Sequence, residues 1–231
     1  MREFNAKLGR LAFSFEWRLS LFTLVLLPLL VTLGFWQLDR ADEKRLLAQR
    51  HQERMALAPL TLQDALSTLR TDPSALADRR ITFMAQAEPN RYWLLDNRLR
   101  GGRFGYEVIA LLHSEGVYVP VNLGWLPGDP ARQSLPDVQL PTERQLWSGR
   151  VYLPAGDAYV LGDNADPDGF PAVIQAYKPV EYARVLERLL ASPVLPFSVR
   201  IDPGHSAAWV ADWPVVNQSP EKHTGYAVQW F

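Results

Sequence analysis

The stretch LSLFTLVLLPLLVTLGFWQL, residues 19–38, is an apolar run that no Asp, Glu, Lys or Arg interrupts. As a helix with a rise of about 1.5 Å per residue, it would span roughly the 30 Å hydrocarbon layer of a bilayer. Pro28 lies in its middle, and helices in lipid tolerate proline better than helices in water. Trp17 and Trp36 lie near its ends, where indoles prefer the membrane interface. The sequence therefore predicts a transmembrane helix over 19–38, preceded by a short tail, residues 1–18.

Two other interpretations of the apolar run are less favourable. A buried core helix with no polar face is unusual in a domain this small. A cleaved signal peptide has a shorter apolar region, about 7–15 residues, and a small-residue cleavage pattern, whereas the bulky and charged GFWQLDR follows here. We interpret the run as an uncleaved anchor. Basic residues flank both ends in nearly equal number, so charge alone does not decide its orientation.

Composition excludes several classes of protein. The 231 residues carry a formal net charge of -1, and acidic residues are interleaved with the basic ones, so no nucleic-acid partner is expected. Cysteine is absent, which excludes disulfides, thiolate metal sites, cysteine nucleophiles and the covalent attachment of a c-type haem.

Helical segments are predicted at three places after the apolar run. Residues 39–55 have the composition of a charged helix that leaves a membrane. TLQD, residues 61–64, resembles a capping box with Asp in place of the usual Glu or Gln, which predicts a short helix after it. PVEYARVLERLLA, residues 179–191, predicts a third helix with proline in its first turn. The expected apolar stripe of that helix consists of Val180, Ala183, Leu186 and Leu190.

The remaining sequence reads as short strands rich in Val, Ile, Tyr, Phe and Trp, separated by turn residues such as Gly101-Gly102 and Gly116. The expected strand segments are 80–87, 91–96, 105–112, 116–127, 145–154, 171–177, 198–202 and 208–216. We predict an α+β fold in which residues 39–222 form a mostly antiparallel β barrel or sandwich behind the N-terminal transmembrane helix.

One loop has part of a calcium-binding pattern. Asn164, Asp166, Asp168 and Gly169 fit its first half, but the position of the bidentate Glu is Gln175. A solvated acidic turn is the better interpretation, so no calcium is expected, and no zinc. No nucleophile or metal motif appears, and we expect that the protein is not an enzyme.

The four histidines are not equivalent. His51, His113 and His205 fall on a charged helix, a strand end and a turn, where a surface or structural imidazole is the common case. His223 instead precedes an aromatic segment at the expected membrane boundary. It could cap a helix or anchor the chain at the interface. A neutral imidazole there could also ligate a haem iron, which requires no cysteine.

Four segments in order resemble the Surfeit locus protein family, whose members are assembly factors for haem–copper cytochrome c oxidase. The first, around LGFWQLDRADEK, resembles a signature carried by Gly34, Trp36, Gln37, Arg40 and Lys44. GYEVIALL is similar to a family strand, and VPVNLGWLP to a segment carried by Val121, Asn122, Gly124, Trp125 and Pro127. HTGYAVQWF resembles the family's entry to a second membrane helix, carried by His223, Tyr226, Ala227, Trp230 and Phe231.

Two departures from the family pattern stand out. Position 123 is Leu where the family usually has Arg, which puts a charge-dependent role of that segment in doubt. Residues 223–231 would be only the start of the second transmembrane helix that the resemblance implies. We therefore expect that the protein continues beyond Phe231.

The resemblance implies a location and a cofactor. Family members place the β domain, here residues 39–222, outside the bacterial cytoplasmic (inner) membrane or in the mitochondrial intermembrane space. In a bacterial protein the domain would be periplasmic and residues 1–18 cytoplasmic. Haem a is implied as a transient ligand, with His223 as its axial group. Trp36 and Trp230 could then stack on the macrocycle, although interface anchoring is the favoured interpretation for both. Gln37 and Arg40 could pair with haem propionates, lipid headgroups or acidic partner loops.

Three hypotheses of function follow. The leading one is a membrane-bound factor that assists haem a insertion into, or stabilisation of, oxidase subunit I, with subunit I, other assembly factors and the lipid bilayer as partners. The second is a protein scaffold that binds oxidase assembly intermediates without haem contact, so that His223→Ala would leave function intact. The third is an anchored extracytoplasmic enzyme, for which the sequence supplies no convergent acid, base and nucleophile.

Overall fold

In a computed structural model, the chain is described over residues 4–8, 11–154 and 167–231. It divides into two compact units, one of Met1–His51 with Pro214–Phe231 and the other of Gln52–Trp213. The helices are α1 (Trp17–Ala56), α2 (Leu62–Thr71), η1 (Pro73–Leu76), α3 (Pro179–Leu190) and α4 (Pro220–Trp230). The strands are β1 (Phe4–Leu8), β2 (Leu11–Phe15), β3 (Arg80–Arg100), β4 (Arg103–Ser114), β5 (Val117–Pro127), β6 (Gln145–Tyr152), β7 (Ala172–Ile174) and β8 (Ser198–Ile201).

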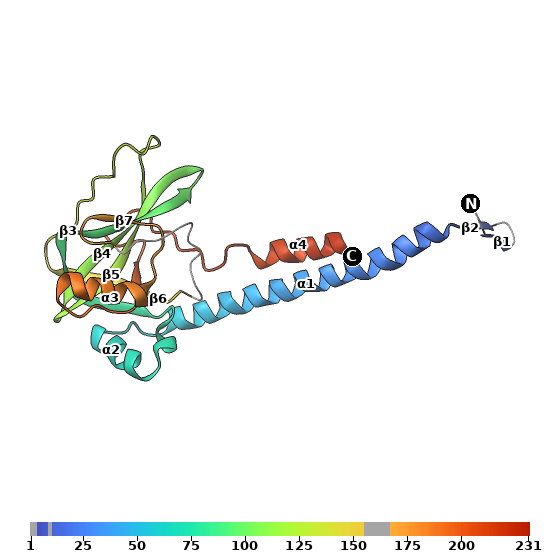
Figure 1. The fold of residues 1–231 in the computed structure, drawn as a ribbon. Helices are drawn as coiled ribbons and strands as arrows, with labels where there is room; N and C mark the ends of the chain where they lie inside the picture. The colour runs from blue at the N-terminus through green and yellow to red at the C-terminus, as the bar shows by residue number, and fades with distance from the viewer. Residues whose placement is uncertain (1–3, 9–10, 155–166) are drawn as a thin grey trace. The chain divides into compact units, whose positions relative to one another are not determined.

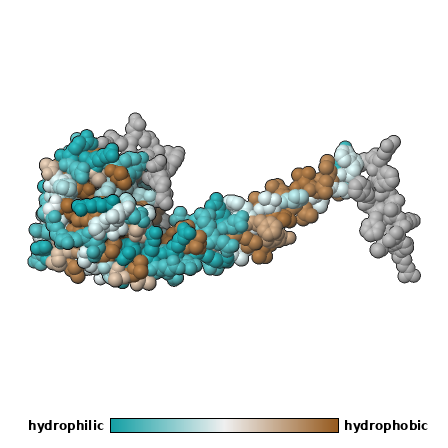
Figure 2. Space-filling model, turned by 90° about the horizontal axis from the view of Figure 1, so that it is seen from below, coloured by the Kyte–Doolittle hydropathy of each residue, from teal (hydrophilic) through white to brown (hydrophobic). Residues whose placement is uncertain are grey.

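Helix α1 joins the predicted apolar run and the charged segment after it into one helix of 40 residues. By length and composition it is able to cross a membrane. Most of its apolar side chains are exposed, and Leu24 has 71 % of its surface accessible. Figure 2 shows this part of the helix as a hydrophobic, brown band that gives way to hydrophilic, teal residues. These features are consistent with the predicted anchor.

Helix α4 lies alongside α1 within the first unit (Figure 1). Gly34 and Ala41 of α1 are buried and lie seven residues apart, which places them on the same helix face. A Cβ atom at Gly34 would approach the Phe231 ring to 2.6 Å, and Ala227 of α4 is also buried. Small residues on both helices thus permit close packing. α4 begins at Pro220 rather than at the expected residue 223, because proline suits the first turn of a helix.

The second unit is built on one mixed sheet with the strand order β4-β5-β8-β6-β3-β7, in which β3 pairs also with β4. Four pairings are antiparallel, as expected for most of the sheet. The β5–β8 and β3–β7 pairings are parallel, so the sheet is not purely antiparallel. The α+β class is therefore confirmed.

Strand β3 corrects the prediction of two separate strands at 80–87 and 91–96. The structure has a single strand of 21 residues with a register shift between Ala87 and Tyr92. Its first part pairs with β6 and its later part with β4. The turn residues Pro89 and Asn90 had suggested that the strand ends there. Instead, a β-bulge accommodates the irregular residues and the strand continues beyond them.

Residues 208–216 are a second correction, because they form no strand. The segment makes one isolated bridge, between Val210 and Trp125 of β5. Trp209 donates its backbone N–H to the carbonyl of Leu123, at 2.9 Å. It meets β5 next to Gly124, whose φ of 106° is a conformation that glycine adopts most readily. The prediction of a strand rested on aromatic and β-branched composition alone. It was wrong because the backbone of this segment pairs with β5 at a single bridge only.

Two apolar clusters lie on opposite faces of the sheet. Neighbouring residues of β3 alternate between them: Leu94 belongs to the larger cluster, and Trp93 and Leu95 belong to the other. The second cluster is covered by α3, which buries Tyr182 and Leu186 against it. The predicted α3 stripe was wrong for one member, because Val180 is 60 % exposed. Tyr182 and Val185 take part in its place.

The predicted capping box is confirmed at the start of α2. Asp64 N–H donates to the Thr61 hydroxyl at 3.1 Å, and Thr61 N–H donates to the Asp64 carboxylate at 3.1 Å. The shorter Asp side chain therefore satisfies the same two backbone donors as the usual Glu.

Candidate functional site

Three side chains of α1 lie on one face of the helix because they are four residues apart: Trp36, Arg40 and Lys44. With His223 of α4 and residues 217–218 just before α4, they line an open hollow of about 290 Å³. All of these residues belong to the first unit. The structure thus brings the signature of the first segment and the histidine of the last segment to one place.

The imidazole of His223 is held by a specific partner. Its Nδ1 lies 2.8 Å from Oε1 of Gln37, and both side chains are half-buried. An amide oxygen only accepts hydrogen bonds, so with this amide orientation Nδ1 donates. The lone pair of the neutral ring then resides on Nε2, the nitrogen that is left for a metal. Such a second partner commonly fixes the tautomer and orientation of a metal-binding histidine.

The two cations of the hollow differ in their partners. Arg40 pairs with Glu43 at 2.5 Å, and its Cζ lies 5.8 Å from the Trp36 ring centroid. Both members of the ion pair are about half exposed, at 47 % each, so solvent screens their attraction and exchange for another anion is easy. Lys44 makes no ion pair with any residue that the structure describes. The hollow therefore presents positive charge beside an imidazole and an indole.

The predicted site residues are only partly brought together. Trp36, Arg40 and His223 line the hollow, and Gln37 bonds to His223. Trp230 is not among the lining residues. Sequence analysis did not assign the lining residues Lys44, Asn217 and Gln218 to the site. Lys44 belongs to the signature and could have been chosen, whereas the amides carry no signal in the sequence.

His205 has a structural role in the second unit, as expected. Its ring stacks on Trp147 with centroids 4.9 Å apart. Nδ1 accepts from the backbone N–H of Ala207 at 3.1 Å, and Nε2 lies 3.0 Å from the Leu146 carbonyl. Both ring nitrogens are therefore used to hold a turn. His113 is exposed and its ring lies 5.1 Å from that of Tyr118.

The rejected calcium motif falls only partly within the described residues. Asn164 and Asp166 lie outside them, while Asp168 and Gly169 lie inside. Within the described ranges, no group of three His, Cys, Asp or Glu side chains is arranged to hold a metal ion.

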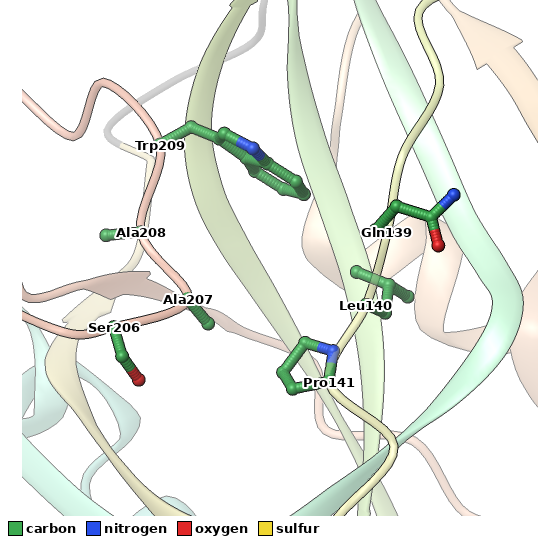
Figure 3. A pocket seen from close by; sticks show the side chains of 7 residues that line it. All are labelled: Gln139, Leu140, Pro141, Ser206, Ala207, Ala208 and Trp209. Carbon is green, nitrogen blue, oxygen red and sulfur yellow. The ribbon is translucent and has the colours of Figure 1, made fainter.

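A second hollow, of about 360 Å³, lies in the second unit (Figure 3). The Trp209 ring faces Leu140 and Pro141 across it, with the side chains of Ala207, Ser206 and other neighbours around its edge. No ionisable side chain lines it. It is suited to apolar contact, and its lining supplies no acid or base for catalysis.

The hollow of the first unit has the features of a binding site: an oriented imidazole, an indole and two basic side chains. Its lining lacks an arrangement of nucleophile and base. These features make the hollow a candidate ligand-binding site. Residues 24–231 match the sequence model of the SURF1 family, so the chain belongs to this family, whose members are generally cytochrome oxidase assembly factors and not typically enzymes.

A relative supports the same assignment. A SURF1-like protein of Dictyostelium discoideum is 33 % identical to the chain over 104 residues. The matching segment covers 42 % of this chain and 38 % of that relative, so it spans well under half of the length of either protein.

Proposed function

We propose that the protein is a membrane-anchored assembly factor for haem–copper cytochrome c oxidase that assists the insertion of haem a into subunit I or its stabilisation there. Membership of the SURF1 family supports the general part of this proposal. The exposed apolar surface of α1 supports the anchor. In this arrangement residues 19–38 cross the bacterial inner membrane, and the sheet unit works in the periplasm with subunit I and other assembly factors.

The observation that carries the haem part is the contact between His223 and Gln37, at 2.8 Å. These residues come from opposite ends of the sequence, and the contact leaves Nε2 as the free basic nitrogen of the ring. An imidazole oriented in this way has the chemistry of an axial haem ligand. Haem iron, when bound, would supply the coordination position that Nε2 fills.

The other residues fit the periphery of a haem. Trp36 offers an aromatic surface beside the imidazole, and Arg40 and Lys44 offer positive charge for the two propionates. Arg40 would exchange its exposed pairing with Glu43 for a propionate. Trp230 is a less favourable contact, because it does not line the hollow, and we assign it to the membrane interface instead.

The size of the hollow suits transient holding. Pockets that enclose a ligand usually measure about 300–1,000 Å³, and this open hollow, at about 290 Å³, lies at the lower limit. Its residues would therefore cover one side of a haem and leave the rest exposed. Weak enclosure favours release to an acceptor protein.

The test is the visible absorption spectrum of the protein purified from cells that make haem a. We compare the wild type with His223→Ala and with His113→Ala, which removes an exposed histidine of the second unit. A haem a spectrum that persists in His113→Ala and is lost in His223→Ala is expected. A spectrum unaffected by His223→Ala would remove that residue as the ligand. Colourless wild-type protein that still copurifies with oxidase subunits would replace the proposal with the scaffold function.

A further inference from the structure

Arg200 occupies a central position on the sheet of the second unit. It lies in β8, opposite Arg150 of β6 and opposite Asn122 of β5. Arg150 in turn lies opposite Arg80 of β3. Three arginines and an asparagine therefore follow one line across four strands. The neighbouring core residues Val151 and Val199 point to the other face, because side chains alternate along each strand.

Two aromatic rings hold the guanidinium of Arg200. Its Cζ lies 3.6 Å from the ring centroid of Tyr152 and 5.1 Å from that of Trp213. Trp213 is itself fixed, because its indole N–H donates to the carbonyl of Ile201 at 2.9 Å. Its own carbonyl accepts a hydrogen bond from Arg150 at 3.2 Å. The arginine is thus oriented by a built arrangement rather than extended freely into solvent.

The guanidinium of Arg200 nevertheless lacks an acceptor among the residues that the structure describes. It makes no hydrogen bond or ion pair with any described residue, and its buried Nε is unsatisfied. The nearby carboxylates have other partners. Glu107 accepts from the Asn122 amide at 2.6 Å and lies 3.6 Å from Arg98, while Asp78 lies 3.6 Å from Arg150. Positive charge therefore exceeds negative charge along this line of the sheet.

Burial makes this excess costly. Removal from water lowers the pKa of Arg200 below its ordinary value, and burial followed by the charge of Arg200 lowers the pKa of Arg150. Buried charges are ordinarily paired, and an unpaired N–H of a guanidinium costs free energy. The aromatic rings offset part of this cost, but a ring face does not accept the in-plane N–H groups of a guanidinium that stacks on it.

We infer that the surface around Arg200, with Arg150, Tyr152 and Trp213, is a binding site for an oxyanion of the carboxylate or phosphate type. A planar guanidinium presents a pair of N–H groups that matches either oxyanion in a bidentate arrangement. Arg150, its neighbour across the strand, adds charge. The two sources of this chemistry are an acidic side chain of a partner protein and a free phosphate. The site lies in the second unit and is independent of the proposed haem site.

The experiment is isothermal titration of the purified full-length chain in detergent, in chloride buffer, with two probes. Inorganic phosphate represents the free anion, and N-acetyl-aspartate amide represents an acidic side chain. The variants are Arg200→Gln and the matched control Arg103→Gln, which removes the same charge at an exposed position of β4. Because hydrogen bonds to a charged group are stronger than those between neutral groups, Arg200→Gln should weaken binding about tenfold or more, and the control should not.

Each outcome decides the inference. Tighter binding of phosphate than of the aspartate probe identifies a free anion as the source, and the reverse identifies an acidic side chain. No binding of either probe to the wild type overturns the inference, as does equal binding by Arg200→Gln. If Arg200→Gln fails to fold, as judged by circular dichroism, Arg200→Lys replaces it. Lysine retains the charge but not the planar fork, so unchanged affinity in that variant would also refute the site.

Discussion

The contact between Gln37 and His223 gives the sharpest prediction for the proposed haem site. Gln37→Ala removes the acceptor of the 2.8 Å contact while the imidazole remains in place. Loss of the partner that orients a metal-binding histidine typically weakens metal binding by about 10–100-fold. Both side chains are only half-buried, so water would replace part of the lost bond. We therefore expect the low end of this range, about tenfold, which corresponds to about 1.4 kcal/mol.

The assay is titration of the full-length protein with ferric haem, followed by visible absorption. Gln37→Ala should raise the dissociation constant about tenfold without moving the absorption maximum, because the iron ligand is the same. Gln37→Glu should bind more tightly than Gln37→Ala, because a carboxylate accepts the Nδ1 proton more strongly. Gln229→Ala, which removes an exposed amide of α4, is the matched control and should bind like the wild type.

Two results would refute this reasoning. Wild-type affinity in Gln37→Ala would show that the contact does not orient the ligand. A spectrum that changes in Gln37→Ala in the same way as in His223→Ala would mean that Gln37 has a direct role at the iron. In either case the free Nε2 of His223 would no longer support the haem proposal.

The remaining predictions concern the second unit. Leu186→Ala, in the core beneath α3, should lower the free energy of unfolding by about 2–5 kcal/mol, whereas Val180→Ala on the exposed side should change it by less than about 0.5 kcal/mol. Thermal unfolding followed by near-ultraviolet circular dichroism compares the two variants. Equal effects would contradict the assigned helix face. The hydrogen bond from the Thr61 hydroxyl, followed by that from its backbone N–H, lowers the pKa of Asp64 below its ordinary 3.8. The stabilising effect of Asp64 is therefore present well above that ordinary pKa and is lost as the pH falls through the lowered pKa. Unfolding midpoints measured from pH 6 to pH 2 should show that Asp64→Asn abolishes this part of the acid dependence, and an identical pH profile in both proteins would disprove it.

Local signals in the sequence predicted local structure well. The capping residues Thr61 and Asp64, the proline at the start of α3 and the glycine turn before β4 all act within a few residues of their own positions. Their physical effect is therefore visible in a short window of sequence. The apolar run in α1 is similarly local, because a continuous helix satisfies its own backbone hydrogen bonds.

Features that depend on distant partners were predicted less well. The length of β3 depends on two different partner strands, and the bulge between Ala87 and Tyr92 is tolerated because the pairing resumes beyond it. Residues 208–216 have strand-like composition but meet β5 at a single bridge. Val180 fits a helical period, yet the sheet cluster contacts a neighbouring face of α3. Pairing and packing partners are not contained in such short segments.

The candidate haem site was likewise predicted well in its local motifs and less well in the contacts between distant segments. The resemblance selected Trp36, Arg40 and His223 as separate motif residues, and the structure places them around one hollow. It did not indicate that Gln37 would contact His223 rather than a ligand directly. Nor did it indicate Asn217 and Gln218, which enter the lining because the chain passes there just before α4.

The departure at position 123 has a physical explanation in this chain. Leu123 is fully buried in the larger core cluster, and its carbonyl accepts the N–H of Trp209. An arginine with the same orientation would place an unpaired charge among apolar side chains, which is unfavourable. Position 123 therefore acts here through packing. Any recognition of anions by the sheet depends instead on Arg200 and Arg150, whose side chains lie on the face opposite this core.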